Sequence, residues 1–191
     1  TTGRDVPMAV PGLTGVVAVA GGAFHALAVK SDGTVWSWGQ NTRGALGDGT
    51  QSHRSTPVQV VGLTGVTTVA AGEGFSLALK ADGTVWSWGS NLYMQLGDGT
   101  TDTHTVPIQV PNLTGVTALA AGRYHSLAVT ASGGVQAWGR NDYGQLGNWI
   151  TGGAPLGVPF SVSGLSGVKS VAGGGFHSVA IKTDGTVWTW G

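Results

Sequence analysis

The sequence predicts an all-β protein, a β-propeller of about four blades with four antiparallel strands each, and three observations carry this prediction. The chain repeats itself about every 50 residues, and every copy ends in a short apolar strand followed by glycine. Glycine-rich turns separate apolar runs of strand length. No window of 11 or more residues keeps the spacing of an amphipathic helix. Four short strands in each unit are typical of a propeller blade. About four such blades would make a partial propeller or a part of a larger or oligomeric ring.

The four strands of a blade are clearest in the second copy. The first three are residues 66–70, 75–80 and 84–89. The turn Asp82-Gly83 joins the second and third strands as a hairpin, for which we expect both central residues at positive φ. Residues 106–110 form the fourth strand, and Pro107 near its start fits an edge strand, because proline donates no ladder hydrogen bond.

The sequence indicates one domain, residues 1–191, built from consecutive units. The units are residues 1–50, 51–100, 101–150 and 151–191. Each blade takes its fourth strand from the unit that follows. The strands that complete the first three blades are residues 56–60, 106–110 and 158–162. The fourth blade, residues 168–191, has no following unit, and residues 6–10 form an edge strand with no preceding blade.

These two orphan pieces are complementary, because an unpaired strand edge favours pairing with another strand. The N-terminal strand could complete the fourth blade of its own chain, or the blade of a second chain in a dimer or a head-to-tail filament. The third alternative is that the chain is a piece of a longer array. The residues expected at the two pairing edges are Val6, Met8, Val10, Val187, Trp188 and Trp190.

Composition narrows the class of partner. Nine Lys and Arg residues balance nine Asp and Glu residues, which leaves no electrostatic footprint for nucleic acid. No apolar run reaches the roughly 18 residues that a membrane span needs. The absence of cysteine excludes disulfides, thiolate chemistry and cysteine zinc sites. We therefore expect a protein partner or a second copy of the chain in a homo-oligomer, with no nucleic acid and no membrane insertion.

The second copy also carries the residues of a known repeat. These are residues 69–72, 75–80, 82–89, Asn91 and 95–100. They resemble the repeat of the regulator of chromosome condensation (RCC1) family, most of all its bacterial versions, and the resemblance covers the whole chain. It implies a β-propeller that usually has seven blades. Known members include an exchange factor for a small GTPase, a plant ultraviolet receptor and a secreted bacterial inhibitor of β-lactamase, so the fold alone does not transfer a function.

Two expectations follow from the resemblance. A ring of four blades would be strained in a family that usually closes with about seven, so completion by a second chain or within a longer array is favoured over self-closure. Exchange between chains ranks slightly ahead, because the chain ends at a blade boundary. The likeness to bacterial versions, together with the sparse charge and the absence of cysteine, suggests an extracellular or cell-surface location.

Most of the tryptophans lie in the glycine-terminated strands. One interpretation is that they sense light, as the tryptophans of the plant ultraviolet receptor do. They are Trp36, Trp38, Trp86, Trp88, Trp138, Trp188 and Trp190. We favour packing between blades, because Gln136 replaces one of them without disturbing the period. The receptor's Gly-Trp-Arg-His-Thr motif is also absent, since residues 122–126 lack the tryptophan. As packing residues, they should each cost roughly 3–5 kcal/mol when changed to alanine.

Candidate metal ligands have a structural explanation. Histidine occupies one position in three copies, His25, His125 and His177, but Phe75 stands there in the second copy, so the position is structural. The acidic turns offer one carboxylate each, where calcium needs six to eight oxygens. Their residues, Asp48, Asp98 and Asn148, are better explained as turn caps. We expect no metal and no cofactor.

Catalysis is also disfavoured by the sequence. His125 and Ser126 are neighbours on a strand, as are His177 and Ser178, so their side chains point to opposite faces and cannot pair as base and nucleophile. No paired carboxylates and no phosphate-binding glycine loop appear. We expect no enzymatic activity.

Function has more room where the copies differ from one another. Loops on a rigid scaffold usually carry binding, and aromatic and arginine residues are enriched in interface hot spots. The candidate protein-binding residues are Arg43, Tyr93, Met94, Arg123, Tyr143 and Trp149. The leading hypothesis is a non-enzymatic, exported protein-binding propeller scaffold that uses loops and exposed strand edges. One alternative is a structural subunit that assembles head-to-tail by blade completion, and another is an exchange-factor-like regulator of a small GTPase.

Overall fold

The computed structural model describes residues 5–191 and contains strands and no helix in that range. The first sheet holds β1 (Val16–Gly21), β2 (His25–Lys30), β3 (Val35–Gly39) and β4 (Arg54–Gln59). The second holds β5 (Val66–Ala71), β6 (Phe75–Lys80), β7 (Val85–Gly89) and β8 (His104–Gln109). The third holds β9 (Val116–Ala121), β10 (His125–Thr130), β11 (Val135–Gly139) and β12 (Leu156–Ser161). The last holds β13 (Val168–Gly173), β14 (Ser178–Lys182) and β15 (Val187–Trp190).

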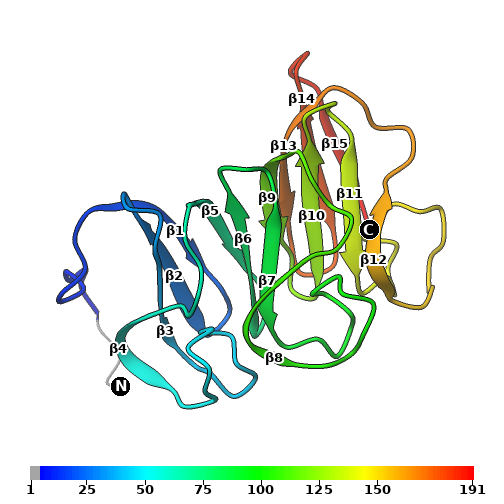
Figure 1. Ribbon diagram of the computed structural model, residues 1–191. Coiled ribbons are helices and arrows are strands. Elements are labelled where there is room, and N and C mark those ends of the chain that lie inside the picture. The colour runs from blue at the N-terminus through cyan, green and yellow to red at the C-terminus, as the bar shows by residue number, and fades with distance from the viewer. Residues whose placement is uncertain (1–4) are drawn as a thin grey trace.

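Each sheet is one antiparallel blade whose strands follow chain order. The fourth strand of each four-stranded blade comes from the following repeat, as the sequence predicts. The first strands of successive blades pack against one another, so the blades fan out in chain order from the blue first sheet to the red last one (Figure 1). The prediction of an all-β, partial propeller is confirmed.

The hairpin turns differ from the expected type. In Asp32-Gly33, the turn of the first copy that is equivalent to Asp82-Gly83, Gly33 takes φ +77° but Asp32 does not take positive φ, so only one of the two central residues is left-handed. Lys30 accepts a hydrogen bond from the Gly33 amide at 2.9 Å, which marks a type I turn that ends in a glycine bulge. Asp32 instead caps the turn, accepting hydrogen bonds from the amide and the hydroxyl of Thr34. The carboxylate thus stabilises a three-residue loop that needs left-handed backbone only at glycine.

The fourth strands start earlier than the sequence suggests. β4 begins at Arg54 rather than residue 56, and β8 and β12 are shifted in the same way. Their prolines therefore stand fourth in the strand. The pairing of β3 with β4 is irregular between Ser37 and Gly39, where Pro57 lies, so its missing N–H costs no ladder hydrogen bond.

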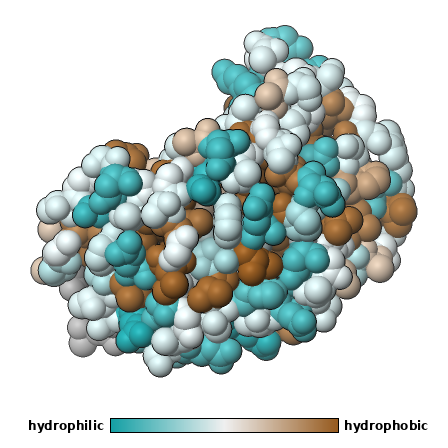
Figure 2. Space-filling view, in the orientation of Figure 1, coloured by the Kyte–Doolittle hydropathy of each residue, from teal (hydrophilic) through white to brown (hydrophobic). Residues whose placement is uncertain are grey.

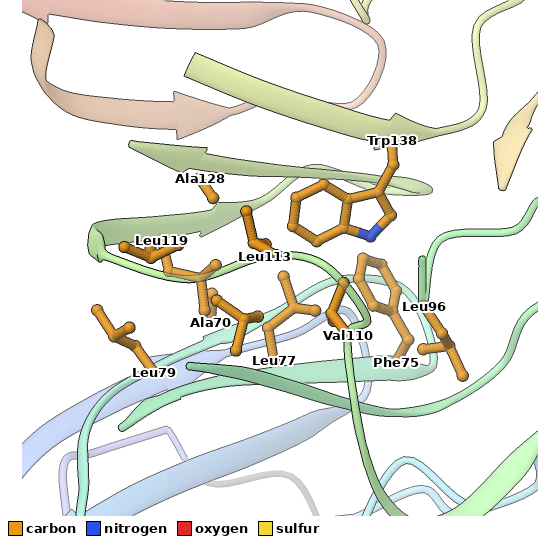
Figure 3. Packing of buried hydrophobic residues seen from close by; sticks show 12 residues of the cluster. Ala70, Phe75, Leu77, Leu79, Leu96, Val110, Leu113, Leu119, Ala128 and Trp138 are labelled. Carbon is orange, nitrogen blue, oxygen red and sulfur yellow. The ribbon is translucent and has the colours of Figure 1, made fainter. Parts of the chain in front are cut away.

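Buried side chains between blades form the core. Trp138 on β11 is fully buried and packs against the second blade, where its indole lies over Phe75, Val110 and Leu113 (Figure 3). Its Nε1 donates a hydrogen bond to the carbonyl of Gln95 at 2.9 Å. Trp88 and Trp190 repeat this bond, with Ala45 and Gln145 as acceptors. The second tryptophan of the strand is therefore the residue that joins neighbouring blades.

The first tryptophan of the strand lies on the same strand face but is less enclosed, because Trp86 packs at the rim of the buried cluster between the first and second blades. Trp86 is half-buried, and its Nε1 donates to Thr84 Oγ1 within the same blade. Lys80 Nζ lies 5.8 Å from its ring centroid. Trp36 and Trp188 repeat this arrangement. Gln136 replaces a tryptophan at this position because the position is only partly enclosed.

The N-terminal segment is not a strand, contrary to the sequence-based assignment. Residues 5–10 pair with no sheet, and Val6 and Met8 are exposed while Val10 is half-buried. A strand needs a neighbouring edge, and in the described chain the open edge of β15, with exposed Val187 and Trp188, has no fourth strand beside it. Self-closure is therefore absent from residues 5–191, and completion by another chain stays a prediction.

Candidate protein-binding face

Two kinds of loop lie at the same end of every blade, because the strands alternate in direction. The first kind joins the first and second strands, and the second kind joins the third and fourth strands. We call this end the loop face. It consists of residues 22–24, 72–74, 122–124 and 174–176, together with residues 40–45, 90–95 and 140–145. Strands fixed by inter-blade packing hold these loops in place, as expected for a binding surface on a rigid scaffold.

Aromatic rings meet across the blade junctions on the loop face. Tyr93 of the second blade lies 4.9 Å from Tyr124 of the third, measured between ring centroids. Tyr143 of the third blade lies 4.9 Å from Phe176 of the fourth. Both pairs are tilted, with interplanar angles of 48° and 51°. Such pairs stabilise a junction and leave their outer edges accessible to a partner.

Two arginines extend the ring pairs into a cluster. The guanidinium carbon of Arg140 lies 4.7 Å from the ring centroid of Tyr93, 5.4 Å from that of Tyr124 and 5.5 Å from that of Phe176. Arg123 lies 5.1 Å from Tyr124 and 5.8 Å from Phe176. These distances allow cation–π attraction, which is stronger where water is excluded. The cluster therefore presents two cations stacked on aromatic faces.

Glu73 links the second blade to this cluster. Its carboxylate accepts hydrogen bonds from Arg123 Nε and, at 2.7 Å, from the hydroxyl of Tyr124. The bond from Arg123 is the main reason that the pKa of Glu73 is lowered. Burial, followed by the bond to Glu73, raises the pKa of Tyr124. The carboxylate thus stays charged and the phenol stays protonated at neutral pH.

A hollow of about 350 Å³ opens on the loop face between the first and second blades. Its walls include Phe24, Arg43, Glu73, Gly74, Leu92 and Tyr93. Phe24 and Leu92 are exposed, and Arg43 has no ion-pair partner among residues 5–191. Aromatic and aliphatic side chains beside a few polar and charged groups suit an organic group of a partner better than a simple ion.

The sequence profile of the RCC1-like domain family matches residues 1–191. The chain belongs to the RCC1-like domain family. Among solved structures, human WBSCR16 is 28% identical with a TM-score of 0.82, and the match covers 94% of this chain and 48% of WBSCR16. Yeast RCC1 (Prp20), solved with Kap60 bound, is 28% identical with a TM-score of 0.82, covering 95% of this chain and 45% of that one. This RCC1-like chain thus spans about half the length of these solved relatives.

A shorter match joins this RCC1-like chain to a much larger protein. The human E3 ubiquitin-protein ligase HERC2 is 48% identical over 46 residues, which is 23% of this chain and 1% of that protein. A match of that length corresponds to about one repeat. It supports the family assignment and carries no activity across.

The structure brings five of the six predicted residues onto the loop face of the RCC1-like fold. Arg43, Tyr93, Met94, Arg123 and Tyr143 lie there. Sequence reasoning left out Tyr124, Arg140 and Phe176, which complete the cluster. A signal for the two aromatics was present, because the residue before the repeated histidine is aromatic in three copies. No sequence signal placed Arg140 among rings from two other blades.

Met94 and Trp149 lie away from the cluster. Met94 is half-buried and lies next to Gly157 of β12. Trp149 is 87% exposed and takes φ +63°, an unusual conformation for a bulky residue. Glycines hold its position in the other copies, and there the amides of Gly49 and Gly99 donate to the fourth strand of the next blade. Trp149 therefore marks the place where a fourth strand of the last blade would pass.

A second hollow, of about 500 Å³, lies beside the open edge of the last blade. Its lining includes Trp149, Ile150, Val162, Leu165, Trp188 and Trp190. Because β15 has no strand on its outer side in the described chain, its backbone groups at this edge remain available for pairing. This second hollow therefore borders the unpaired edge of β15.

Buried histidine–serine contacts join the blades beneath the loop face, and they differ from the neighbour pairs weighed in the sequence. His25 Nε2 lies 2.9 Å from Ser76 Oγ, and His125 Nε2 lies 3.0 Å from Ser178 Oγ, each across a junction. Ser76 Oγ donates to the carbonyl of Ala45, so the histidine must be the donor to the serine. A nucleophile would need the opposite direction of donation.

Burial lowers the pKa of His25 and His125 to about 4, so both rings are neutral at physiological pH. Among residues 5–191, no group of three or more His, Cys, Asp or Glu side chains is arranged to hold a metal ion. Within the same residues, no helix is long and apolar enough to cross a membrane. The buried contacts to serine give both histidines a structural role between blades.

Proposed function

We propose that this RCC1-like chain is a non-enzymatic scaffold that binds another protein through its loop face. One observation carries the proposal: Arg140 is stacked among Tyr93, Tyr124 and Phe176, at the exposed ends of three successive blades. Arginine and tyrosine are the residue types that dominate binding energy at protein interfaces. Rigid strands hold the cluster, so little conformational freedom is lost when a partner binds.

The surface and the comparisons are consistent with this proposal. Figure 2 shows hydrophobic and hydrophilic residues interspersed on the side in view, and a non-obligate interface is about as apolar as such a surface. The yeast RCC1 relative was solved with a protein, Kap60, bound. That complex belongs to the relative, and it supports protein binding here as the class of function without naming the partner.

A selection from a displayed peptide library tests the proposal. Peptides selected on the native chain should lose at least tenfold in affinity for Arg140→Ala, which removes the cation that contacts three rings. Lys80→Ala is the matched control, because Lys80 stacks on Trp86 near the opposite, hairpin end of the blade. Peptides that bind both variants equally well would contradict a binding site on the loop face.

A second candidate function is head-to-tail assembly by strand addition, and the open edge of β15 beside Trp149 favours it. The segment containing Val6, Met8 and Val10 of a second copy would supply the strand. Light scattering over a concentration series should then give about twice the chain mass of 19.2 kDa, or growing species. Val187→Lys should weaken such assembly by placing a charge at the exposed edge. A monomer at every concentration would refute this candidate.

An extracellular or cell-surface location is part of the first proposal, and cell fractionation of the source organism would test it. The sparse charge and the absence of cysteine favour this location. The exchange-factor alternative rests on the family likeness alone. A nucleotide-release assay with a small GTPase is its test.

A further inference from the structure

The first blade junction lacks three side chains that fill the second junction. Three residues of the first, Ala45, Gly74 and Ser90, line its hollow. One repeat of 50 residues further on, the equivalent positions hold Gln95, Tyr124 and Arg140. All three replacements are from larger to smaller. The hollow therefore exists because this junction omits a ring, an arginine and an amide that the fold otherwise accommodates.

Gly74 is the decisive position of the three. In the other copies its place is taken by Phe24, Tyr124 and Phe176. Two of these rings, Tyr124 and Phe176, stack on the tyrosine of the preceding blade, Tyr93 and Tyr143 respectively. Gly74 takes φ +74°, which a side-chain-bearing residue rarely adopts, so the ring is absent and the local backbone differs as well.

Arg43 stands where the other junctions have the stacking tyrosine. It is exposed at the rim of the hollow and has no ion-pair partner in the part of the chain that the structure describes. Arginine stacks well on aromatic faces, and Arg140 does so in the next junction at 4.7 Å from a ring centroid. The first junction thus keeps an arginine suited to stacking and lacks the ring on which it would stack.

We propose that the hollow between the first two blades binds an aromatic side chain of the partner protein, in the place that Tyr124 occupies at the next junction. This inference rests on the proposed function and names the chemistry of its partner. Phe24 and Leu92 provide apolar walls, and Arg43 covers the face of the incoming ring. A cavity of about 150 Å³ accepts a benzene ring, so the hollow of about 350 Å³ has room for a phenol or an indole.

The experiment is a titration of the 191-residue chain with N-acetyl-L-tyrosinamide, followed by amide chemical shifts in NMR spectra. The amides of Gly74 and Ser90 should shift and reach half-saturation near about 1 mM, as expected for so small a ligand. N-acetyl-L-leucinamide, which has the same backbone and no ring, should bind at least tenfold more weakly. Equal shifts with the two amides, or no shift with either, would overturn the proposal.

Two variants that copy other repeats supply the controls. Ser90→Arg reproduces Arg140 and should fill the hollow, so binding of the tyrosine amide should fall at least tenfold. Thr42→Leu reproduces Leu92 at the rim without filling the hollow, and it should change binding less than threefold. An unchanged urea midpoint shows that each variant is folded. Undiminished binding to the folded Ser90→Arg protein would refute this location.

The outcome is separable from that of the proposed function. Displayed peptides that depend on Arg140 but need no aromatic residue would leave the loop face as a binding site and refute the aromatic pocket. The opposite outcome is also possible to recognise. Peptides that bind Arg140→Ala as well as the native chain, but need an aromatic residue and lose affinity for Ser90→Arg, would refute the arginine–aromatic cluster as the main contact. They would support the aromatic pocket between the first two blades.

Discussion

The two tryptophans of each glycine-terminated strand should differ in their contribution to stability. Trp138 is fully buried between the second and third blades, whereas Trp86 is half-buried and hydrogen-bonded within its own blade. Trp138→Ala removes a large side chain from the core and should lower the free energy of unfolding by about 3–5 kcal/mol. The carbonyl of Gln95 keeps a partner in that variant, because Ser126 Oγ also donates to it at 2.8 Å. The loss therefore reports packing rather than an orphaned acceptor.

The matched variant is Trp86→Gln, which copies Gln136 of the third repeat. It loses the contact with Lys80 and part of the packing, and it should cost about 1–2 kcal/mol. Urea unfolding followed by far-ultraviolet circular dichroism measures both values without depending on tryptophan fluorescence. Equal losses in the two variants, or a loss below about 2 kcal/mol for Trp138→Ala, would refute the division into fully enclosed and partly enclosed tryptophans.

Three further predictions follow from the buried network and the loop face. Because His25 and His125 titrate near 4 when folded and near 6.5 when unfolded, the unfolded chain binds more protons in this window, and stability should fall as pH drops from 6.5 to 4. Each histidine contributes up to about 3 kcal/mol to this change in the free energy of unfolding. His125→Phe, which copies Phe75, should reduce the fall of the urea midpoint between pH 6.5 and 4.5. An unchanged pH dependence of the midpoint would contradict the lowered pKa of His125. Asn91 is fully buried, donates to Asp98 Oδ1 and the Thr100 carbonyl and accepts from the Leu96 amide, so Asn91→Ala should cost at least about 2 kcal/mol in urea unfolding. Asp98→Asn, which copies Asn148, is its milder control. Glu73→Gln weakens a partly exposed ion pair with Arg123 and should change the free energy of unfolding by less than about 1 kcal/mol. The affinity of peptides selected on the loop face should change measurably in the same variant. A larger loss of stability in urea would assign Glu73 a mainly structural role.

The sequence predicts the blades well because each blade depends on local information. Residues 75–80 and 85–89 are joined by residues 81–84, and both the strand pattern and the turn are visible within 15 positions. The turn type differs from the prediction because Asp82 acts through its side chain, which accepts hydrogen bonds from Thr84, and not through a left-handed backbone. The prediction of a strand over residues 6–10 is wrong for the single chain. A strand forms only beside the edge of another strand, and the sequence of the segment does not say whether such an edge is near.

The candidate site was predictable only in part, because its contacts join residues of different blades. Residue type alone identified Arg43, Tyr93, Arg123 and Tyr143, since these loops vary between copies. Arg140 was missed because its three ring partners come from three blades and lie 16 to 47 positions away in sequence. The histidine–serine contacts were missed for the same reason, as each pair spans 51 or 53 positions.

The differences between copies make the junctions chemically distinct even though the blades share one core. Leu27, Leu77 and Leu127 are equivalent and fully buried, so the packing between strands is nearly the same throughout. On the loop face, the first junction is an open hollow beneath Arg43, while the second is filled by Tyr124 and Arg140. A repeat scaffold with identical junctions would offer the same chemical environment to a partner at each junction. Here the junctions differ, so Ser90→Arg should act mainly on contacts at the first junction and Arg140→Ala mainly on those at the second and third.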